Sequence, residues 1–388
     1  MAILQKHFFL VHWVIILETE KIELDLVKWV NDGFTLGYIN EKPIFVLGGI
    51  PGEKVICEVF EVSSKFKKAK VINILHKSSL RIQPPCSIYL NCGGCSFQHI
   101  DYESERSIKK KLLIENLIYS GIIISDQNLS INYLFSKEYH YRNNVQLKIQ
   151  KEKIGFFKIK SNDIVKLPDD GCNLLHEKLN EYILNNKMLN FDGKFRFDSE
   201  GIKNYSKDIS VYNINNKDIL LPKNSFFQIN SYLIESWLGQ ILEYSGNSEN
   251  ILELFSGAGT ISVFLAERHK SLEGYELSYD MVNSSITNTG NLSKCKFIKK
   301  DLYKEKINYS YNDFICVANP PRAGLGKIIK KFIIEKKPKK IIYSSCNYTT
   351  LIPDLKDLMN NYKILSIDII DFFPRTPYIE TLVVLEKI

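Results

Sequence analysis

The hydrophobic pattern of the chain changes near residue 250. Beyond that point, short apolar runs alternate with amphipathic stretches, which predicts strands and helices in turn and therefore a mostly parallel, doubly wound α/β sheet. The expected strands are Ile251–Phe255, Leu272–Tyr275, Cys295–Ile298, Phe314–Ala318 and Lys340–Ser344. Two later apolar runs leave no room for a helix between them and predict a terminal antiparallel hairpin, Ile364–Ile370 with Thr381–Leu385.

The first part of the chain has β-rich runs separated by turn signals, which is typical of a small β-barrel. The runs Ile44–Leu47, Lys54–Phe60 and Lys70–Leu75 predict an OB-like barrel over residues 19–78. Residues 79–245 mix strands and loops, so we expect a mixed α+β central domain there. Its amphipathic helix at Ser104–Gly121 is also able to pack on the last domain, residues 246–388.

Residues 1–18 form an extension whose role the pattern leaves open. Its apolar run, Phe8–Leu17, is interrupted by His12, is too short to span a bilayer and lacks a small-residue cleavage site. A buried strand, or an extension from a misplaced start, explains this run better than a membrane anchor. We therefore expect no association with a membrane.

Charge points to a polyanionic partner. The chain has 388 residues, too many for one ordinary domain, and a net charge of +7. The stretch Lys65–Arg81 contains six basic residues and no acidic one. A basic run is usually a solvated face, but on a five-stranded barrel it is also a common way to hold a nucleic-acid backbone. We expect the barrel to bind nucleic acid.

The Gly-rich stretch ELFSGAGTISVFLA predicts a nucleoside site. Gly257 and Gly259 lie between a strand and a helix, where the backbone must approach a ligand closely. The third glycine of the dinucleotide fingerprint is replaced by Ser262, and Glu276, at the end of the next strand, can accept both ribose hydroxyls. S-adenosylmethionine (SAM) is therefore favoured over a dinucleotide. The terminal hairpin also suits a class I methyltransferase sheet better than a dinucleotide fold.

Candidate chemistry lies at the ends of the later strands. Cys346 directly follows a strand, whereas a structural cysteine would normally lie within one, and Glu380 supplies a carboxylate. Methylation of uracil carbon 5 requires these two groups, a thiolate that adds at carbon 6 and a base that removes the carbon 5 proton. Taken singly, Cys346 is more often structural and Glu380 is more often a surface carboxylate, so the pair depends on its context.

That context resembles a known family, the bacterial RNA uridine-5-methyltransferases. The resemblance runs from about residue 20 to the end and is greatest to the 23S ribosomal RNA branch with a TRAM domain and an iron–sulfur cluster. The match to SCNYTTL implies that Cys346 is the nucleophile, and the match to FPRTPYIET implies that Glu380 is the general base. The implied cofactor contacts are Gln228, Phe255, Gly257, Gly259, Thr260, Glu276, Asp301 and Asn319.

The clustered cysteines fit the same family. Eight cysteines without an export signal predict a reducing, cytoplasmic compartment. The resemblance implies a [4Fe–4S] cluster held by Cys86, Cys92, Cys95 and Cys172. From the residues alone, zinc stays open, with His99 in place of Cys172. A cluster would be structural or would position RNA, because methyl transfer moves no electrons.

Two residues depart from the family pattern. Asn319 stands where the family usually has Asp, and Tyr378 where a His is frequent. Asn319 can still exchange two hydrogen bonds with uracil, so we expect an active enzyme on 23S ribosomal RNA. Transfer RNA is the alternative target within the class. A non-catalytic RNA-binding or assembly factor is the alternative outside it. No obligate protein partner is evident.

Overall fold

The computed structural model describes residues 20–124, 131–150, 153–186 and 193–388. The predicted strand at Phe8–Leu17 lies outside them. The chain forms two compact units. Of the described residues, the smaller contains 20–28 and Thr35–Ser78, and the larger contains Trp29–Phe34 and those from Ser79 to Ile388. None of the described helices is both long and apolar enough to cross a bilayer.

The smaller unit is the predicted five-stranded barrel, closed in the order β1-β2-β3-β5-β4. Its strands are β1 (Lys21–Trp29), β2 (Phe34–Ile39), β3 (Lys42–Leu47), β4 (Lys54–Val62) and β5 (Lys67–His76). Alternate apolar side chains point inward and form its core, including Leu24, Val46, Val55 and Ala69. The barrel that the turn signals predicted is thus present.

The basic run of the barrel is partly neutralised in space. Lys67 pairs with Glu20 at 2.5 Å, Lys68 with Glu61 at 3.0 Å and Lys70 with Glu58 at 3.0 Å. The acidic partners lie on β4 or just before β1, both of which pair with other strands of the same barrel. The stretch has no acidic residue in the sequence, but acidic residues lie beside it on the surface, because strand pairing brings opposite charges next to one another.

The middle of the larger unit contains a second, smaller sheet of order β11-β10-β7-β8-β9. The strands of this sheet are β7 (Asn144–Gln150), β8 (Lys153–Phe157), β9 (Ile164–Lys166), β10 (Gly193–Asp198) and β11 (Gly201–Asn204). Helix α2 (Glu177–Asn185) packs on it, and β12 (Ser210–Ile214) and β13 (Lys217–Leu221) form a separate hairpin. Val145, Leu179 and Phe195 belong to a core of their own beneath this sheet.

The main sheet has eight strands in the order β16-β15-β14-β17-β18-β20-β19-β6. They are β6 (Ile131–Leu134), β14 (Asn250–Leu254), β15 (Ser271–Glu276), β16 (Cys295–Lys299), β17 (Ile315–Ala318), β18 (Lys340–Ser345), β19 (Tyr362–Ile370) and β20 (Glu380–Lys387). Strand β20 is antiparallel to both of its neighbours. The predicted class I methyltransferase-type sheet with its terminal antiparallel hairpin is therefore confirmed, with β20 inserted between β18 and β19.

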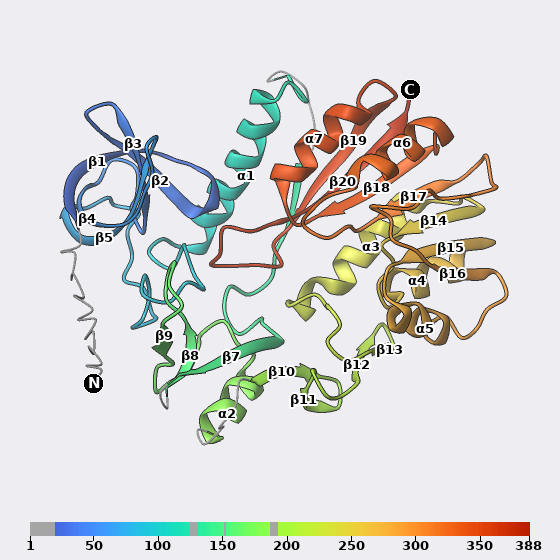
Figure 1. Cartoon of the computed structure of the whole chain (residues 1–388), viewed down its shortest axis with the longest axis horizontal. Helices are drawn as coiled ribbons and strands as arrows, with labels where there is room; N and C mark the ends of the chain where they lie inside the picture. The colour runs from blue at the N-terminus through green and yellow to red at the C-terminus, as the bar shows by residue number, and fades with distance from the viewer. Residues whose placement is uncertain (1–19, 125–130, 151–152, 187–192) are drawn as a thin grey trace, which may run out of the picture. The chain divides into compact units, whose positions relative to one another are not determined.

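Helices cover both faces of the main sheet (Figure 1). They are α1 (Tyr102–Tyr119), the 3-10 turn η2 (Ser231–Leu233) with α3 (Ile234–Ser245), α4 (Thr260–Arg268), α5 (Tyr279–Asn288), α6 (Gly326–Lys336) and α7 (Tyr348–Leu358). Leu113 and Leu117 of α1 lie in one core with Leu355 of α7. Trp237 of α3 and Phe264 of α4 lie in the other core. Helix α1, which precedes the central region in sequence, thus packs on the main sheet.

Candidate active site

The loop after β14 has an unusual backbone. Phe255, Gly257 and Gly259 all have positive φ, at 60°, 58° and 80°. A Cβ atom at Gly259 would lie 2.9 Å from the Cα atom of Ser285, so only glycine fits where this loop meets α5. The Ser285 hydroxyl donates to the Gly257 carbonyl at 2.9 Å. The loop is therefore held tightly and directs its backbone toward the amino end of α4, which begins at Thr260.

Two carboxylates flank this loop. Glu276, at the end of β15, accepts hydrogen bonds from the backbone N–H groups of Gly257 and Ser278, both at 3.0 Å. Glu253 is buried within β14, accepts a hydrogen bond from the Ser262 hydroxyl at 2.5 Å, and has its other oxygen without a hydrogen-bond partner. Burial, with a smaller contribution from Glu276, raises the pKa of Glu253 to about 8.

The remaining predicted contact residues lie around the same strand ends. Asp301 follows β16 and accepts a hydrogen bond from the backbone of Tyr303, whose ring lies 5.6 Å from that of Phe255. Gln228 is 6 % exposed and its side-chain oxygen has no hydrogen-bond partner. The neighbouring Phe227 packs in the same core as Ala258 of the loop. The structure thus gathers these residues at one edge of the sheet, where ligands bind in such folds.

Cys346 and Glu380 are brought together by strand pairing. Cys346 directly follows β18, and Glu380 is the first residue of β20. These strands are antiparallel with Ser345 opposite Thr381, so the next step along the ladder sets Cys346 beside Glu380. The negative charge of Glu380 interacts with Cys346 and, in addition to burial, raises the pKa of the thiol. Residues 34 positions apart in sequence therefore share one site.

An arginine that the sequence analysis did not single out faces the thiol. Burial raises the pKa of Cys346, and Arg322 opposes this through its charge and a side-chain hydrogen bond. Arg322 belongs to the loop after β17, two residues beyond Pro320. Its carbonyl oxygen accepts hydrogen bonds from Asn347 at 3.1 Å and Thr350 at 3.0 Å. Its guanidinium group lies 4.7 Å from the centre of the Tyr378 ring. The position of Arg322 beside Asn319 in one motif was the available sequence signal.

Asn319 itself opens this loop. It directly follows β17, is half-buried, and donates its backbone N–H to the carbonyl oxygen of Leu254 at 3.3 Å. That bond ties the Asn319 loop to the end of β14, next to the glycine loop. Asn319 therefore lies between the cofactor side and the Cys346 side of the site.

Glu380 is almost fully buried, with 2 % of its surface exposed. Burial raises the pKa of this carboxyl to about 7, and the Ser344 hydroxyl, which donates to Oε1 at 2.5 Å, opposes the rise. Ser344 in turn accepts a hydrogen bond from the indole Nε1 of Trp237 at 3.1 Å. Near neutral pH the carboxyl is thus poised to gain or lose a proton, as a general base requires.

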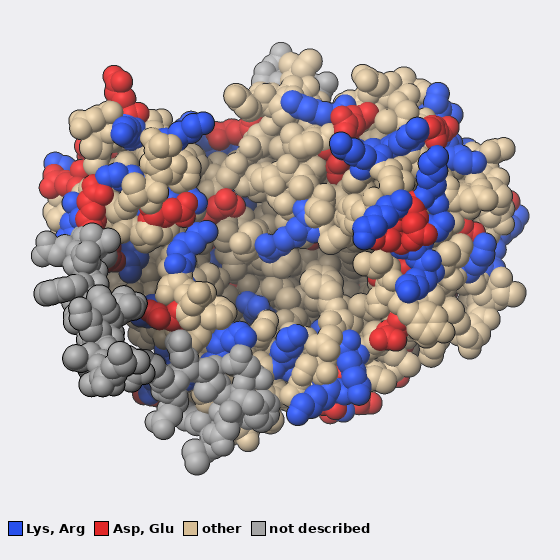
Figure 2. Space-filling model, viewed as in Figure 1, with Lys and Arg blue, Asp and Glu red and all other residues tan. Residues whose placement is uncertain are grey.

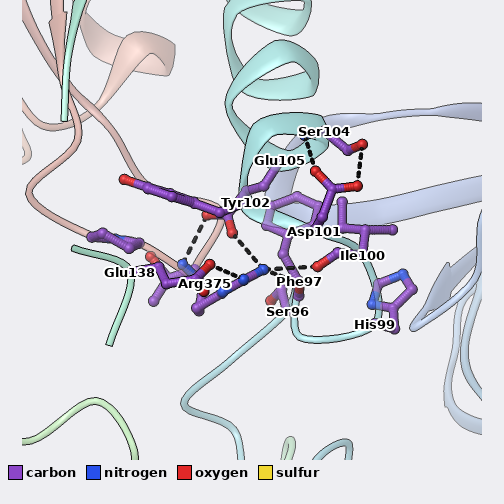
Figure 3. Close-up of polar contacts among 12 residues, drawn as sticks. Ser96, Phe97, His99, Ile100, Asp101, Tyr102, Ser104, Glu105, Glu138 and Arg375 are labelled. Carbon is purple, nitrogen blue, oxygen red and sulfur yellow. Dashed lines mark hydrogen bonds and ion pairs between the residues drawn. The ribbon is translucent and has the colours of Figure 1, made fainter. Parts of the chain in front are cut away.

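The loop that leads to Glu380 is fixed by a buried arginine (Figure 3). The Arg375 guanidinium donates to the carbonyl oxygens of Phe97 at 3.1 Å and Ile100 at 2.8 Å and forms ion pairs with Glu105 and Glu138. Its backbone N–H donates to Glu105 at 2.8 Å, and its carbonyl oxygen accepts from the backbone of Ser96 and Phe97. The segment that follows Cys95 is therefore bonded directly to the loop that precedes Glu380.

The four predicted metal ligands are neighbours. All eight cysteines are free thiols. The pKa of Cys95 is raised by burial and by the charges of Cys172, Cys92 and Cys86. Among the residues that the structure describes, no group of three or more His, Cys, Asp or Glu side chains is already arranged to hold a metal ion. The thiols thus share one neighbourhood without the geometry of ligation.

Each of these thiols also receives hydrogen bonds. Backbone N–H groups donate to Cys86 from Ile88 and Tyr89, to Cys92 from Gly94, and to Cys172 from Leu174 and Leu175, and the Gln98 side chain bonds to Cys95. Such donors stabilise sulfur in its negatively charged form, as ligation to a cluster requires. The alternative ligand, His99, is buried and has Nδ1 2.6 Å from the Tyr89 hydroxyl. These hydrogen bonds suit thiolates, but within the described part of the chain the side chains are not arranged to hold a metal, so the cluster stays a prediction.

Comparisons with known proteins show the family to which the chain belongs. Residues 203–388 match the family model described as tRNA (Uracil-5-)-methyltransferase. A protein of Leptospira interrogans serovar Lai, an RNA methyltransferase by name, is 33 % identical over 95 % of both chains. An RNA methyltransferase of Aquifex aeolicus is 28 % identical over 95 % of this chain and 99 % of its own. The chain belongs to the RNA methyltransferase family to which the Leptospira relative belongs, and its part from residue 203 onward matches the uracil-5-methyltransferase model.

A solved structure shares the fold of this methyltransferase. The tRNA (uracil-54, C5)-methyltransferase of Pyrococcus abyssi, crystallised with S-adenosyl-L-homocysteine, superimposes with a TM-score of 0.70 and 23 % identity. The alignment covers 93 % of this chain and 99 % of the other. This likeness supports the fold, and the relatives and the family model above make the chain an RNA methyltransferase, which confirms the expected reaction class.

Proposed function

We propose that the enzyme methylates carbon 5 of a uridine in RNA through a covalent adduct between Cys346 and carbon 6. The observation that carries this proposal is the pairing of β18 with β20, which sets a thiol beside a buried carboxyl and leaves Arg322 hydrogen-bonded to the thiol. A non-catalytic RNA-binding factor would have no need for this arrangement. Asn319, which stands where the family usually has Asp, leaves the thiol, the carboxyl and the arginine in place.

The proposed reaction begins with the Cys346 thiolate, which forms a bond to carbon 6 and moves the double-bond electrons of the ring toward carbon 5 and O4. Carbon 5 then takes the methyl group, whose bond to the sulfonium breaks and leaves its electron pair on sulfur. Glu380 removes the carbon 5 proton. The electrons of that C–H bond restore the ring double bond, and the thiolate leaves carbon 6. Uridine and SAM thus give 5-methyluridine, S-adenosylhomocysteine and one proton.

SAM is assigned to the edge of the sheet built from the glycine loop. Glu276, fixed by two backbone N–H groups, presents a carboxylate suited to ribose hydroxyls. Phe255 and Tyr303 offer ring surface for the adenine, and Asp301 lies at the end of the next strand. Gln228 has a buried oxygen with no hydrogen-bond partner, which suits it to a ligand group. Asn319 reaches the same side through its bond to Leu254.

A trapping experiment tests the two catalytic roles. RNA that contains 5-fluorouridine has no removable proton at carbon 5, so the wild-type enzyme should form a methylated adduct that survives denaturing electrophoresis. On ordinary RNA, Glu380→Gln should add and transfer the methyl group but stall before elimination, and the same adduct should accumulate. Normal turnover by Glu380→Gln would contradict the assignment of the base. Failure of the wild-type enzyme to form any fluorouridine adduct would favour the non-catalytic alternative.

We propose 23S ribosomal RNA as the target. The support is the resemblance to the branch that combines a TRAM-like barrel with a four-cysteine site, both of which have counterparts here. Transfer RNA is the second candidate, since the matching family model carries that description. Mass mapping of 5-methyluridine in ribosomal and transfer RNA from a deletion strain tests this target. Loss of 5-methyluridine from transfer RNA alone would overturn the proposal.

The cytoplasmic location and the lack of an obligate protein partner stay predictions.

The barrel is proposed to contribute to RNA affinity. Because Lys67 and Lys68 have acidic neighbours, part of their charge is already neutralised. Replacing Lys65, Lys67 and Lys68 by Gln should therefore lower affinity modestly and flatten its salt dependence. A measurement of RNA affinity against salt concentration checks this, and an unchanged slope would show that the run is only a solvated face.

A [4Fe–4S] cluster is proposed at Cys86, Cys92, Cys95 and Cys172. The support is the four neighbouring thiols and the N–H donors directed at them. Its contribution would be to crosslink three separate stretches of chain, since methyl transfer involves no redox step. Anaerobically purified protein should be brown and contain about four iron atoms per chain, as this cluster type implies. Colourless protein with one zinc would overturn the assignment.

A further inference from the structure

Three buried side chains from three elements form a directed hydrogen-bond chain that ends on Glu380. Trp237 of α3, Ser344 of β18 and Glu380 of β20 are 2 %, 1 % and 2 % exposed. The indole Nε1 donates to the Ser344 oxygen at 3.1 Å, and that hydroxyl donates to Oε1 of Glu380 at 2.5 Å. The indole nitrogen can only donate. The direction of the first bond is therefore fixed, and the single Ser344 proton is left for the carboxyl.

We propose that Ser344, oriented by Trp237, is a positioning residue that holds Glu380 as an aimed carboxylate and so sets the pH range in which the base works. The inference rests on the proposed role of Glu380 in removing the carbon 5 proton. Neither Ser344 nor Trp237 touches the reacting atoms. Both act through the carboxyl.

The physical reason is the competition between burial and hydrogen bonding. Burial raises the pKa of Glu380, and the bond from Ser344 is the contact that opposes the rise. A free hydroxyl would be able to rotate and accept a hydrogen bond from a neutral carboxylic acid. Because the indole N–H donates to its oxygen, the Ser344 hydroxyl is instead oriented as a donor toward Oε1 of Glu380. A donated hydrogen bond is stronger to a carboxylate than to a neutral carboxylic acid, so this orientation favours the ionised form of Glu380.

The charged and titratable neighbours do not replace this contact. From the turn after β18, Cys346 faces Glu380, and Arg322, from the loop after β17, is hydrogen-bonded to that thiol. On the β19 side, Ile370 lies opposite Glu380, and the next residue, Asp371, directs its carboxylate to Lys109 at 3.0 Å. From α3 the facing group is the uncharged indole of Trp237. Among the described residues around this carboxylate, the Ser344 hydroxyl is the group that donates a hydrogen bond to it.

The test compares adduct formation with adduct breakdown in single-turnover reactions over a range of pH. In a plot of the rate of adduct breakdown against pH, the rate falls on the acid side, where Glu380 becomes protonated. Ser344→Ala should shift this acid limb to higher pH by about one to two units, the equivalent of a lost hydrogen bond to a charged group. Breakdown at pH 7 should then slow by roughly tenfold or more, while adduct formation, which depends on Cys346, changes much less. Trp237→Phe should shift the limb in the same direction by a smaller amount. Ser344→Thr, which keeps the hydroxyl, should restore it.

A matched control is Ser366→Ala. Ser366 lies on β19, and its hydroxyl is 3.0 Å from the Tyr244 hydroxyl and 3.5 Å from the Asp368 carboxylate, within the same sheet but on another carboxylate. This variant should leave the acid limb unchanged. The indole N–H signals of the three tryptophans give a readout without turnover. The Trp237 signal, identified by its absence in Trp237→Phe, should follow the ionisation of Glu380 in the wild type and stop doing so in Ser344→Ala.

Two outcomes would overturn the inference. One is an acid limb in Ser344→Ala that matches the wild type. The other is an equal loss in formation and breakdown, which would indicate a merely structural role. Either result, combined with accumulation of adduct by Glu380→Gln, leaves the proposed function intact. Normal turnover by Glu380→Gln would instead show that Glu380 is not the base, which is the role on which the inference rests.

Discussion

The enzyme has two cysteine sites that differ in what surrounds the sulfur. At Cys346 one thiol faces one cation, Arg322, and one carboxyl, Glu380. At the second site, Cys86, Cys92, Cys95 and Cys172 face one another and a ring of N–H donors. A lone thiol beside an arginine can ionise and attack, whereas four neighbouring, half-buried thiols can ionise together only with a cation among them. The neighbours of a cysteine, and not its residue type alone, thus decide which of the two proposed roles it suits.

The largest expected effect is the removal of the lone thiol. Cys346→Ala should lower methyl transfer by at least about 10⁴-fold, because no adduct can form at carbon 6. Binding of SAM should be retained, since the glycine loop is untouched. Radiolabel transfer to RNA and denaturing electrophoresis measure both effects. Covalent attachment by the alanine variant would show that another residue is the nucleophile.

Removal of one thiol from the other site should act on stability rather than on chemistry. Cys172→Ser should cost the protein its iron and brown colour and lower its melting temperature by several degrees, because a crosslink between distant segments is lost. SAM affinity should stay close to that of the wild type. Iron analysis, calorimetry and SAM titration check the three points. Cys295→Ser, outside both sites, is the control and should keep the iron.

A medium effect is expected where the cation is removed from Cys346. Arg322 lowers the pKa of this thiol, so Arg322→Met should raise it and reduce the thiolate fraction at neutral pH. The rate of adduct formation should fall by about tenfold for each unit of pKa and recover as the pH increases. A profile of adduct formation against pH measures this. A loss of rate that is the same at every pH would assign Arg322 to RNA binding instead.

The smallest effect is expected at Asn319. If the amide merely replaces the usual carboxylate, Asn319→Asp should preserve or raise the rate. If the amide is built into recognition of uracil, a second acceptor would oppose a uracil acceptor and cost about 1–3 kcal/mol. Measurement of kcat and KM with an RNA substrate separates the two outcomes. Either result leaves the contrast between the two cysteine sites unchanged.

Local pattern predicted the main sheet because each strand from β14 to β18 is an apolar run bounded by turns. The same reasoning missed β6, whose four residues pair with β19, more than 230 positions later in the chain. It identified Cys346 and Glu380 from motifs but not Ser344 or Trp237. Their importance arises only when α3 packs against the β18–β20 ladder. Long-range contacts between short segments leave no periodicity that a sequence pattern can detect.

For the Lys65–Arg81 run, the structure instead adds acidic partners that the sequence pattern did not predict. Counting charges along the chain ignores partners across a strand, and three of its lysines have acidic partners there. Over the right-hand part of the face in Figure 2, basic side chains are interspersed with acidic ones, whereas those around the hollow in the middle are mostly basic. A net charge of +7 is therefore a weak guide to where RNA lies.

The position of β20 has a consequence for the order in which the enzyme becomes active during synthesis. This strand is made after β18 and β19 yet lies between them, and it brings Glu380 with it. A nascent chain that ends before residue 380 already contains Cys346 but lacks the strand that pairs with both β18 and β19. The carboxyl beside the thiol and the continuity of the sheet around it are therefore completed together, when β20 is added.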